Sequence, residues 1–178
     1  MGGGLVNPKL AVALTGRRGE ALEEYKKVIL ALNNKVVEEA PADLTINTHV
    51  CRGNYHSTFF SSGAYDGVAD LLFGEENVNA YYLEYDDERS GGFAPLAKIT
   101  GNKKVVLGLV TTKTPKLEDK QSVIARIKEA SKYVSLENLY LSPQCGFASC
   151  EIGNKLTEEE QWAKLKLVKE IAEEVWGA

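Results

Sequence analysis

The sequence has few features of secreted, membrane-bound or nucleic-acid-binding proteins. It contains only three cysteines and two histidines among 178 residues, and its formal net charge of −4 reflects no excess of basic side chains. Three cysteines is an odd count in a chain with no secretory signal, so free thiols are favoured over a disulfide framework. The acidic balance argues against a nucleic-acid partner, and no apolar run approaches the roughly 18 residues of a membrane span. We therefore expect a cytoplasmic protein that contacts no membrane.

The hydrophobic content, 44% of 178 residues, is sufficient for a domain with its own core. No low-complexity linker divides the chain, which predicts one domain over residues 1–178. We expect residues 1–16 to form a leader or an extended arm. Within that segment, the apolar run 8–14 fits either an extra strand or part of the arm.

Helical periodicity alternates with short runs of β-forming residues from residue 19 onward. The predicted helices are 19–40, 65–73, 93–99, 118–134 and 157–176, and the predicted strands are 43–50, 78–85, 104–111 and 139–141. Strands spaced roughly 25 to 35 residues apart call for parallel pairing through right-handed helical crossovers. The third strand is apolar at nearly every position, as in a strand covered on both faces. Four such strands fit either a small open sheet or half of a (β/α)₈ barrel.

Four side chains with metal-binding groups lie at, or just after, the ends of three of these strands. His49 and Cys51 lie two residues apart at the end of the first strand, so they point to one face. Glu84 is at the end of the second strand, and Cys145 follows the fourth. Parallel α/β folds bind ligands at the carboxyl ends of their strands, which predicts that the four lie at one edge. Imidazole, thiolate and carboxylate are zinc ligands, so this set is a candidate zinc site.

Each of these residues also fits an ordinary structural role when it is taken alone. A free cysteine is usually a small buried hydrophobe, and Glu84 could be a salt-bridged strand end. Cys150 and His56 do not match the geometry of the other four, and core or surface roles fit them better. The acidic run 86–88 is typical of a solvated loop, although its position beside the candidate site leaves room for contact with a substrate.

Three motifs resemble the C-terminal catalytic region of cobalamin-independent methionine synthases, in particular their short, single-barrel bacterial relatives. The motifs are Thr48-His49-Val50-Cys51, then Leu83-Glu84 with Arg89-Ser90 after it, and Ser142-Pro143-Gln144-Cys145-Gly146. They occur in the family's order, and the resemblance extends over residues 17–176. It implies α/β architecture in which this chain forms the last four βα units of a (β/α)₈ TIM barrel, a half-barrel. Residues 17–178 would then be the C-terminal half of a methionine-synthase-like barrel.

The resemblance also implies an activity. It implies a catalytic zinc on the four candidate ligands, and transfer of a methyl group from 5-methyltetrahydrofolate, as its polyglutamate, to the thiol of homocysteine, giving methionine. A hard carboxylate is the natural ligand to leave a sulfur-rich zinc, so Glu84 would be displaced by the incoming thiol. Asp86, Arg89 and Ser90 are candidates for substrate binding.

One stretch departs from the family pattern. The family's methionine synthases carry a histidine just before Ser-Pro at the end of the third of these strands, as proton donor. Lys113 occupies that position in Thr111-Thr112-Lys113-Thr114-Pro115. A lysine donates a proton at neutral pH when burial or a nearby cation lowers its pKa, so Lys113 is the candidate donor here.

Two other functions fit the same residues. The chain could be a zinc-dependent alkyltransferase with another methyl donor or thiol acceptor, or a non-catalytic half-barrel, because four protein ligands without an open position is the pattern of structural zinc. A half-barrel also exposes two sheet edges and one inner face. We therefore expect association with a second copy or with a missing N-terminal half, and weak activity or none from the chain alone.

Overall fold

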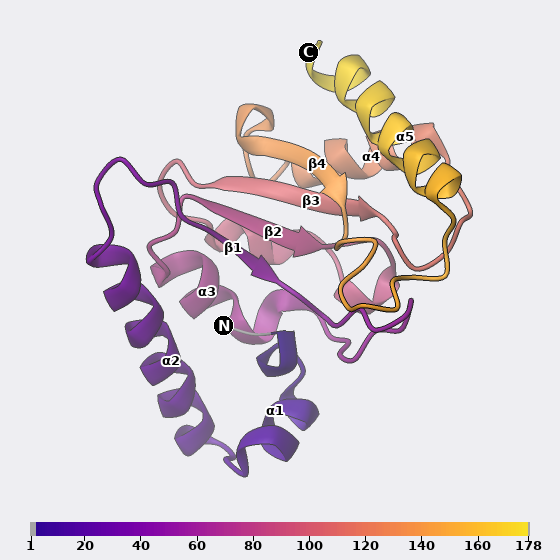
Figure 1. Ribbon diagram of the computed structural model, residues 1–178. Coiled ribbons are helices and arrows are strands. Elements are labelled where there is room, and N and C mark those ends of the chain that lie inside the picture. The colour runs from indigo at the N-terminus through magenta and orange to yellow at the C-terminus, as the bar shows by residue number, and fades with distance from the viewer. Residues whose placement is uncertain (1–2, 178) are drawn as a thin grey trace.

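Four parallel strands form a single sheet in the order β1-β2-β3-β4; α-helices connect β1 to β2 and β3 to β4, and short 3₁₀ turns connect β2 to β3 (Figure 1). The computed structural model describes residues 3–177. The strands are β1 (Asn47–Val50), β2 (Ala80–Glu84), β3 (Lys104–Val110) and β4 (Leu139–Pro143). The predicted α/β class with parallel strands is confirmed. All four strands end at the same edge of the sheet, which is where the candidate ligands were expected.

Five α-helices and several short 3₁₀ turns complete the fold. The helices are α1 (Pro8–Thr15), α2 (Glu20–Glu38), α3 (Ala69–Glu75), α4 (Lys120–Ala130) and α5 (Glu158–Trp176). Helix α5 begins with a capping box, in which the Thr157 side chain accepts from the backbone of Glu160 and the Glu160 side chain accepts from the backbone of Thr157. Among the described residues, no helix is both long enough and apolar enough to cross a membrane.

The hydrophobic core lies between the outer face of the sheet and the helices. Alternate residues of β2 and β3, such as Tyr81, Leu83 and Leu107, point to this side and are at most 1% exposed. They join one apolar cluster with residues of α3, α4 and α5, among them Phe73 and Ile127. Full burial of such side chains contributes about 1.5–3 kcal/mol each, which is what holds the strand ends in place.

The inner face of the sheet is partly open and carries tyrosines. Tyr82 and Tyr140 flank Val106 in register and are 40% and 45% exposed, whereas Val106 itself is 8% exposed and Val110 is fully buried. The apolar inner residues of β3 are therefore already covered within the chain. The inner face is more amphipathic than a continuous apolar strand suggests, and association with another chain stays a prediction.

The structure corrects the expectation for the N-terminal segment. The apolar run that was expected as a strand or an extended arm is helix α1. The Asn7 side chain caps it by accepting from the backbone of Lys9 and Leu10, and Pro8 occupies the first helical turn, where it is favoured. Residues 1 and 2 of the expected leader lie outside the described residues. The helix expected over 93–99 is the 3₁₀ turn Ala94–Lys98.

A glycine and a bulge bring the end of β4 close to β3. The pairing of β3 with β4 shifts register between Gly108 and Val110, and the backbone of Gln144 then donates to the Val110 carbonyl over 2.8 Å. A Cβ on Gly108 would lie 2.7 Å from the Cα of Gln144 and 2.8 Å from the carbonyl oxygen of Leu83. Bulges re-aim the residues that follow them, and this one directs Gln144 and Cys145 onto the sheet edge.

The substitution Gly108→Ala tests this close approach. Both neighbours of the added methyl are backbone atoms, so the sheet must shift, and we expect a loss of about 1–3 kcal/mol in the free energy of unfolding. Gly92→Ala is the matched control, since no described atom lies within 4 Å of its Cβ position. It should be neutral or stabilise by up to about 1 kcal/mol. Urea unfolding midpoints measure both, and equal midpoints for the two variants would contradict the packing described here.

Candidate metal centre

The carboxyl ends of the strands bring His49, Cys51, Glu84 and Cys145 together. Each offers one ligand atom, and all four atoms lie within 4.8 Å of one another. Glu84 is fully buried, the two thiols are partly buried and the side chain of His49 is 36% exposed. The cluster is therefore reachable from solvent on its imidazole side and enclosed on its carboxylate side.

The Glu84 carboxylate is held by groups from several segments. Its Oε1 accepts a hydrogen bond of 2.9 Å from the backbone of Arg52 and lies 3.5 Å from His49 Nε2, while its Oε2 lies 3.4 Å from Arg89 Nη2. Burial alone would raise the pKa of Glu84. The hydrogen bonds from His49 and Arg52 and the charge of Lys113 outweigh burial and hold that pKa below its ordinary value. Glu84 is thus an anion at neutral pH.

The two thiols of the cluster differ in ionisation. A hydrogen bond from Cys51 is the largest influence on Cys145, and with further ones from His49 and Ser149 it lowers the pKa of Cys145 to about 4. The same contact acts oppositely on Cys51, whose pKa is raised because its thiol donates to the neighbouring thiolate and is partly buried. In the metal-free chain the pair therefore carries one negative charge, on Cys145.

His49 has the hydrogen bonding of a metal-binding imidazole. Its Nδ1 lies 3.1 Å from the backbone carbonyl of Tyr82, to which it can donate, leaving Nε2 to face Glu84. A donor bond from one ring nitrogen to a carbonyl fixes the tautomer and presents the other nitrogen as a ligand. Without a metal, hydrogen bonds to Cys145 and Glu84 raise the pKa of His49 to about 9.

The structure places the predicted substrate-binding residues behind Glu84. The Arg89 guanidinium is 6% exposed, lies 2.6 Å from Asp86 and also pairs with Asp87. The guanidinium also lies 5.0 Å from the centroid of the Phe59 ring and 3.4 Å from Glu84 Oε2, so it orients that carboxylate. Ser90 is fully buried, and its hydroxyl has no hydrogen-bond partner within residues 3–177. Their role in substrate binding stays a prediction.

Lys113 lies beside the cluster on the segment that follows β3. Its Nζ is buried and has no hydrogen-bond partner among the described residues. Its charge acts on both Glu84 and Asp86. This position fits the proton donor expected from the sequence, which likewise stays a prediction.

Sequence reasoning missed two buried residues beside the ligands. The guanidinium of Arg52 lies over the ring of Tyr65, 4.4 Å from its centroid, while the backbone of Arg52 binds Glu84. Gln144 is 1% exposed next to Cys145. The only available signal was their place inside the His-Val-Cys-Arg and Pro-Gln-Cys motifs. His56 contacts the Gly153 carbonyl over 3.0 Å and, like Cys150, lies outside the four-residue cluster.

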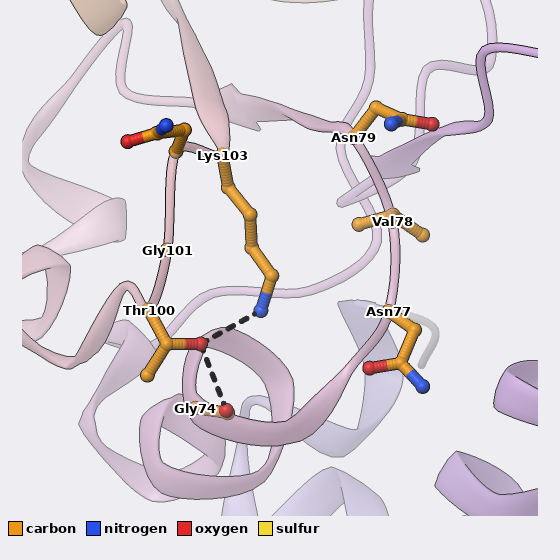
Figure 2. Close-up of a pocket in the computed structure, with 8 residues that line it drawn as sticks. Gly74, Asn77, Val78, Asn79, Thr100, Gly101 and Lys103 are labelled. Carbon is orange, nitrogen blue, oxygen red and sulfur yellow. Dashed lines mark hydrogen bonds between the residues drawn. The ribbon is translucent and has the colours of Figure 1, made fainter.

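Two pockets lie at opposite edges of the sheet. One, of about 310 Å³, adjoins the cluster and is lined by His49, Tyr82, Leu83, Ser142, Pro143, Gln144, Cys145 and Gly146. The other, of about 440 Å³, lies where β2 and β3 begin (Figure 2). Its lysine, Lys103, donates to Thr100 over 3.0 Å and to the carbonyl of Phe73. No histidine, cysteine or carboxylate lines this second pocket, whereas His49 and Cys145 of the cluster line the first.

The sequence matches the family described as cobalamin-independent synthase, catalytic domain, over residues 15–174. It is 50% identical over 159 residues to the uncharacterized protein YxjG of Bacillus subtilis, covering 89% of this chain and 42% of that protein. It is 29% identical over 103 residues to the methionine synthase of Pyrococcus horikoshii, covering 58% of this chain and 27% of that enzyme. The chain thus spans about two fifths of the length of the first of these relatives.

Two solved structures resemble this fold. A crystal structure from Listeria monocytogenes, provisionally named a vitamin-B12-independent methionine synthase, matches with a TM-score of 0.69 and 40% identity, covering 99% of this chain and 46% of that one. A B12-independent methionine synthase from Shewanella sp. W3-18-1, in complex with selenomethionine, matches with a TM-score of 0.68 over 86% of this chain and 44% of that one. At 22% identity, this second likeness shows the fold alone.

Alkylation of the metal-free chain tests the assigned ionisation of Cys145. With a pKa of about 4 for Cys145 and about 9 for His49, neither group changes its charge between pH 6 and 8. The rate of reaction of Cys145 with iodoacetamide, followed by peptide mass spectrometry, should therefore change by less than about twofold across that range. Cys51, held as a thiol, should react more slowly. A Cys145 rate that rises nearly tenfold per pH unit, as for an ordinary thiol, would contradict the assignment.

Proposed function

Because this chain belongs to the cobalamin-independent methionine synthase family, we propose that it binds zinc and takes part in methyl transfer to a thiol. The thiol acceptor is homocysteine and the methyl donor is 5-methyltetrahydrofolate with a polyglutamate tail. The observation that carries this proposal is the convergence of four ligand atoms within 4.8 Å at the carboxyl edge of the sheet. Because the chain spans only part of its relatives, the activity of the whole protein is part of the proposal.

The residues present fit a zinc ion. Two cysteines, one histidine and one glutamate supply the sulfur, nitrogen and oxygen donors that zinc prefers. Metal sites also need outer contacts that orient each ligand. The carbonyl of Tyr82 does this for His49, and Arg89 and the backbone of Arg52 do it for Glu84. The convergence of the four ligands and the contacts that orient them favour a metal site over four unrelated structural roles.

When bound, zinc would supply the Lewis acidity that lowers the pKa of a substrate thiol and keeps it as a nucleophilic thiolate at neutral pH. Glu84 is the hard ligand of a sulfur-rich set and is the one suited to withdraw as a thiol approaches. The charges of Arg89 and Lys113 would stabilise the carboxylate after it withdraws. The proton of the thiol leaves to solvent on the open side, where His49 is exposed.

Lys113 is the residue we assign to the second proton. In the transfer, a bond forms between the substrate sulfur and the methyl carbon while the bond from that carbon to the donor nitrogen breaks. The departing nitrogen then needs a proton. The buried ammonium of Lys113, which has no hydrogen-bond partner among the described residues, can supply it.

Zinc titration of single cysteine variants tests the ligand assignment. Cys51→Ser and Cys145→Ser should each weaken zinc binding by more than about 100-fold, because each removes a direct ligand where even outer contacts matter 10–100-fold. Cys150→Ser is the matched control, since Cys150 is outside the cluster, and it should bind one zinc as the wild type does. Equilibrium dialysis measures the affinities. Unchanged binding by Cys145→Ser would contradict the site.

The same proteins test the reaction. Methionine formation from homocysteine and methyltetrahydrofolate triglutamate should depend on zinc and disappear in Cys145→Ser. Lys113→Met should keep its zinc and lose at least about 100-fold in rate, the usual contribution of a proton donor. A zinc-loaded wild-type chain that is stabilised by the metal but neither binds nor methylates homocysteine would instead indicate structural zinc.

A further inference from the structure

In the side-chain amide of Gln144, hydrogen bonds hold the oxygen but not the nitrogen. Its Oε1 accepts hydrogen bonds from the Thr112 backbone N–H over 2.9 Å and from the Thr112 hydroxyl over 2.7 Å. Asn154 in turn holds Thr112, donating to its carbonyl over 2.7 Å and to its hydroxyl over 3.3 Å. These contacts join segments about thirty to forty residues apart, so they are set by the fold.

This network leaves the amide nitrogen with nothing to bind. A backbone N–H can only donate, so the group of Gln144 that faces it must be the oxygen. The nitrogen Nε2 therefore points away from Thr112, and it is buried without a hydrogen-bond partner in the part of the chain that the structure describes. A buried donor left unpaired costs about 1–3 kcal/mol. Orphaned groups of this kind in native proteins call for an explanation, and a missing ligand is one.

Gln144 borders the pocket in which such a ligand would bind. Gln144 lines the pocket of about 310 Å³ together with His49 and Cys145, two of the four convergent ligands. The register shift after Gly108 and the bond from the Gln144 backbone to Val110 seat it there. A molecule whose sulfur reaches the cluster would therefore place the rest of its atoms in this pocket, against Gln144.

We propose that Gln144 determines specificity for the thiol substrate by donating a hydrogen bond from Nε2 to the substrate's carboxylate. This inference rests on the proposed function and names the group that distinguishes an amino-acid thiol from other thiols. The nitrogen presents only N–H groups, so its ligand must be an acceptor, and an anionic oxygen is the strongest acceptor available. The apolar walls formed by Tyr82 and Pro143 suit the methylene groups between sulfur and carboxylate.

The size of the pocket favours the thiol over the methyl donor as the partner of Gln144. About 310 Å³ is at the lower end of the range for ligand pockets, roughly 300–1,000 Å³. A compact amino acid fits within that volume, whereas a folate with its glutamate tail would extend well beyond it.

Gln144→Glu removes the donor while keeping an oxygen that can accept from Thr112, and it also places a negative charge beside the pocket. One oxygen of the new side chain still accepts from Thr112, while the other replaces Nε2 with an acceptor of similar size. Gln121→Glu is the matched control, because Gln121 is an exposed residue of α4 whose amide bonds only to Glu174 among the described residues. Zinc content by dialysis and the urea midpoint are measured first for both variants.

Calorimetry of the zinc-loaded chain then measures the affinities of homocysteine and of 3-aminopropane-1-thiol, which lacks the carboxylate. The wild type should prefer homocysteine by at least about tenfold, since hydrogen bonds to charged groups contribute that much or more. In Gln144→Glu the preference for homocysteine should vanish, while 3-aminopropane-1-thiol, whose ammonium the new carboxylate does not repel, should bind at least as tightly as it does to the wild type. Gln121→Glu should behave as the wild type.

Three results would overturn the inference. Equal affinity of the wild type for the two thiols would show that no carboxylate is recognised. A preference that persists in Gln144→Glu, or equal losses for both thiols, would assign Gln144 a purely structural role. In these cases the proposed function stands, because thiols still bind. If neither thiol binds the zinc-loaded wild type, the proposed function fails and this inference fails with it.

Discussion

The burial of one carboxylate, that of Glu84, is the constraint on which the site depends. An ionised carboxylate removed from water is strongly destabilising unless other groups compensate its charge. Here the compensation comes from a backbone N–H after β1, an imidazole on β1, a guanidinium after β2 and an ammonium after β3. These groups come from the ends of three different strands, so the carboxylate can be buried only when all three strand ends are in place. The fold and the site are therefore coupled through a single group.

This coupling explains why residues that look like surface charges are buried. Arg89 is held by Asp86 and Asp87 on one side and by Glu84 on the other, so the acidic run after β2 belongs to the site. Asp86 is almost fully buried, and burial raises its pKa even though Arg89 and Thr111 act in the opposite direction. A metal ion at the cluster would add a positive charge on the open side of Glu84, where it would balance the negative charges of Glu84 and Cys145.

Much of this could be predicted from the sequence, for physical reasons that differ between residues. The four parallel strands followed from their spacing and from the apolar character of 104–111. The convergence of His49, Cys51, Glu84 and Cys145 followed from the rule that the carboxyl ends of parallel strands meet at one edge. Both inferences rest on local sequence patterns, which can be recognised without knowledge of the tertiary contacts. Helix α1 was missed although its signal was local, because Asn7 and Pro8 were not considered as a cap.

The orientation of Gln144 could not be predicted, because it depends on Thr112 and Asn154, which are distant in sequence and contribute through a loop of irregular structure. The inward direction of the Arg89 side chain was also missed, although its partners Glu84, Asp86 and Asp87 lie within five residues of it. The central claim, that the four convergent residues bind one zinc, is tested most directly by X-ray absorption spectroscopy of the zinc-loaded chain. The account predicts a first shell of two sulfur atoms at about 2.3 Å and two nitrogen or oxygen atoms at about 2.0–2.2 Å. A shell of nitrogen and oxygen atoms alone, or one with a single sulfur, would contradict it.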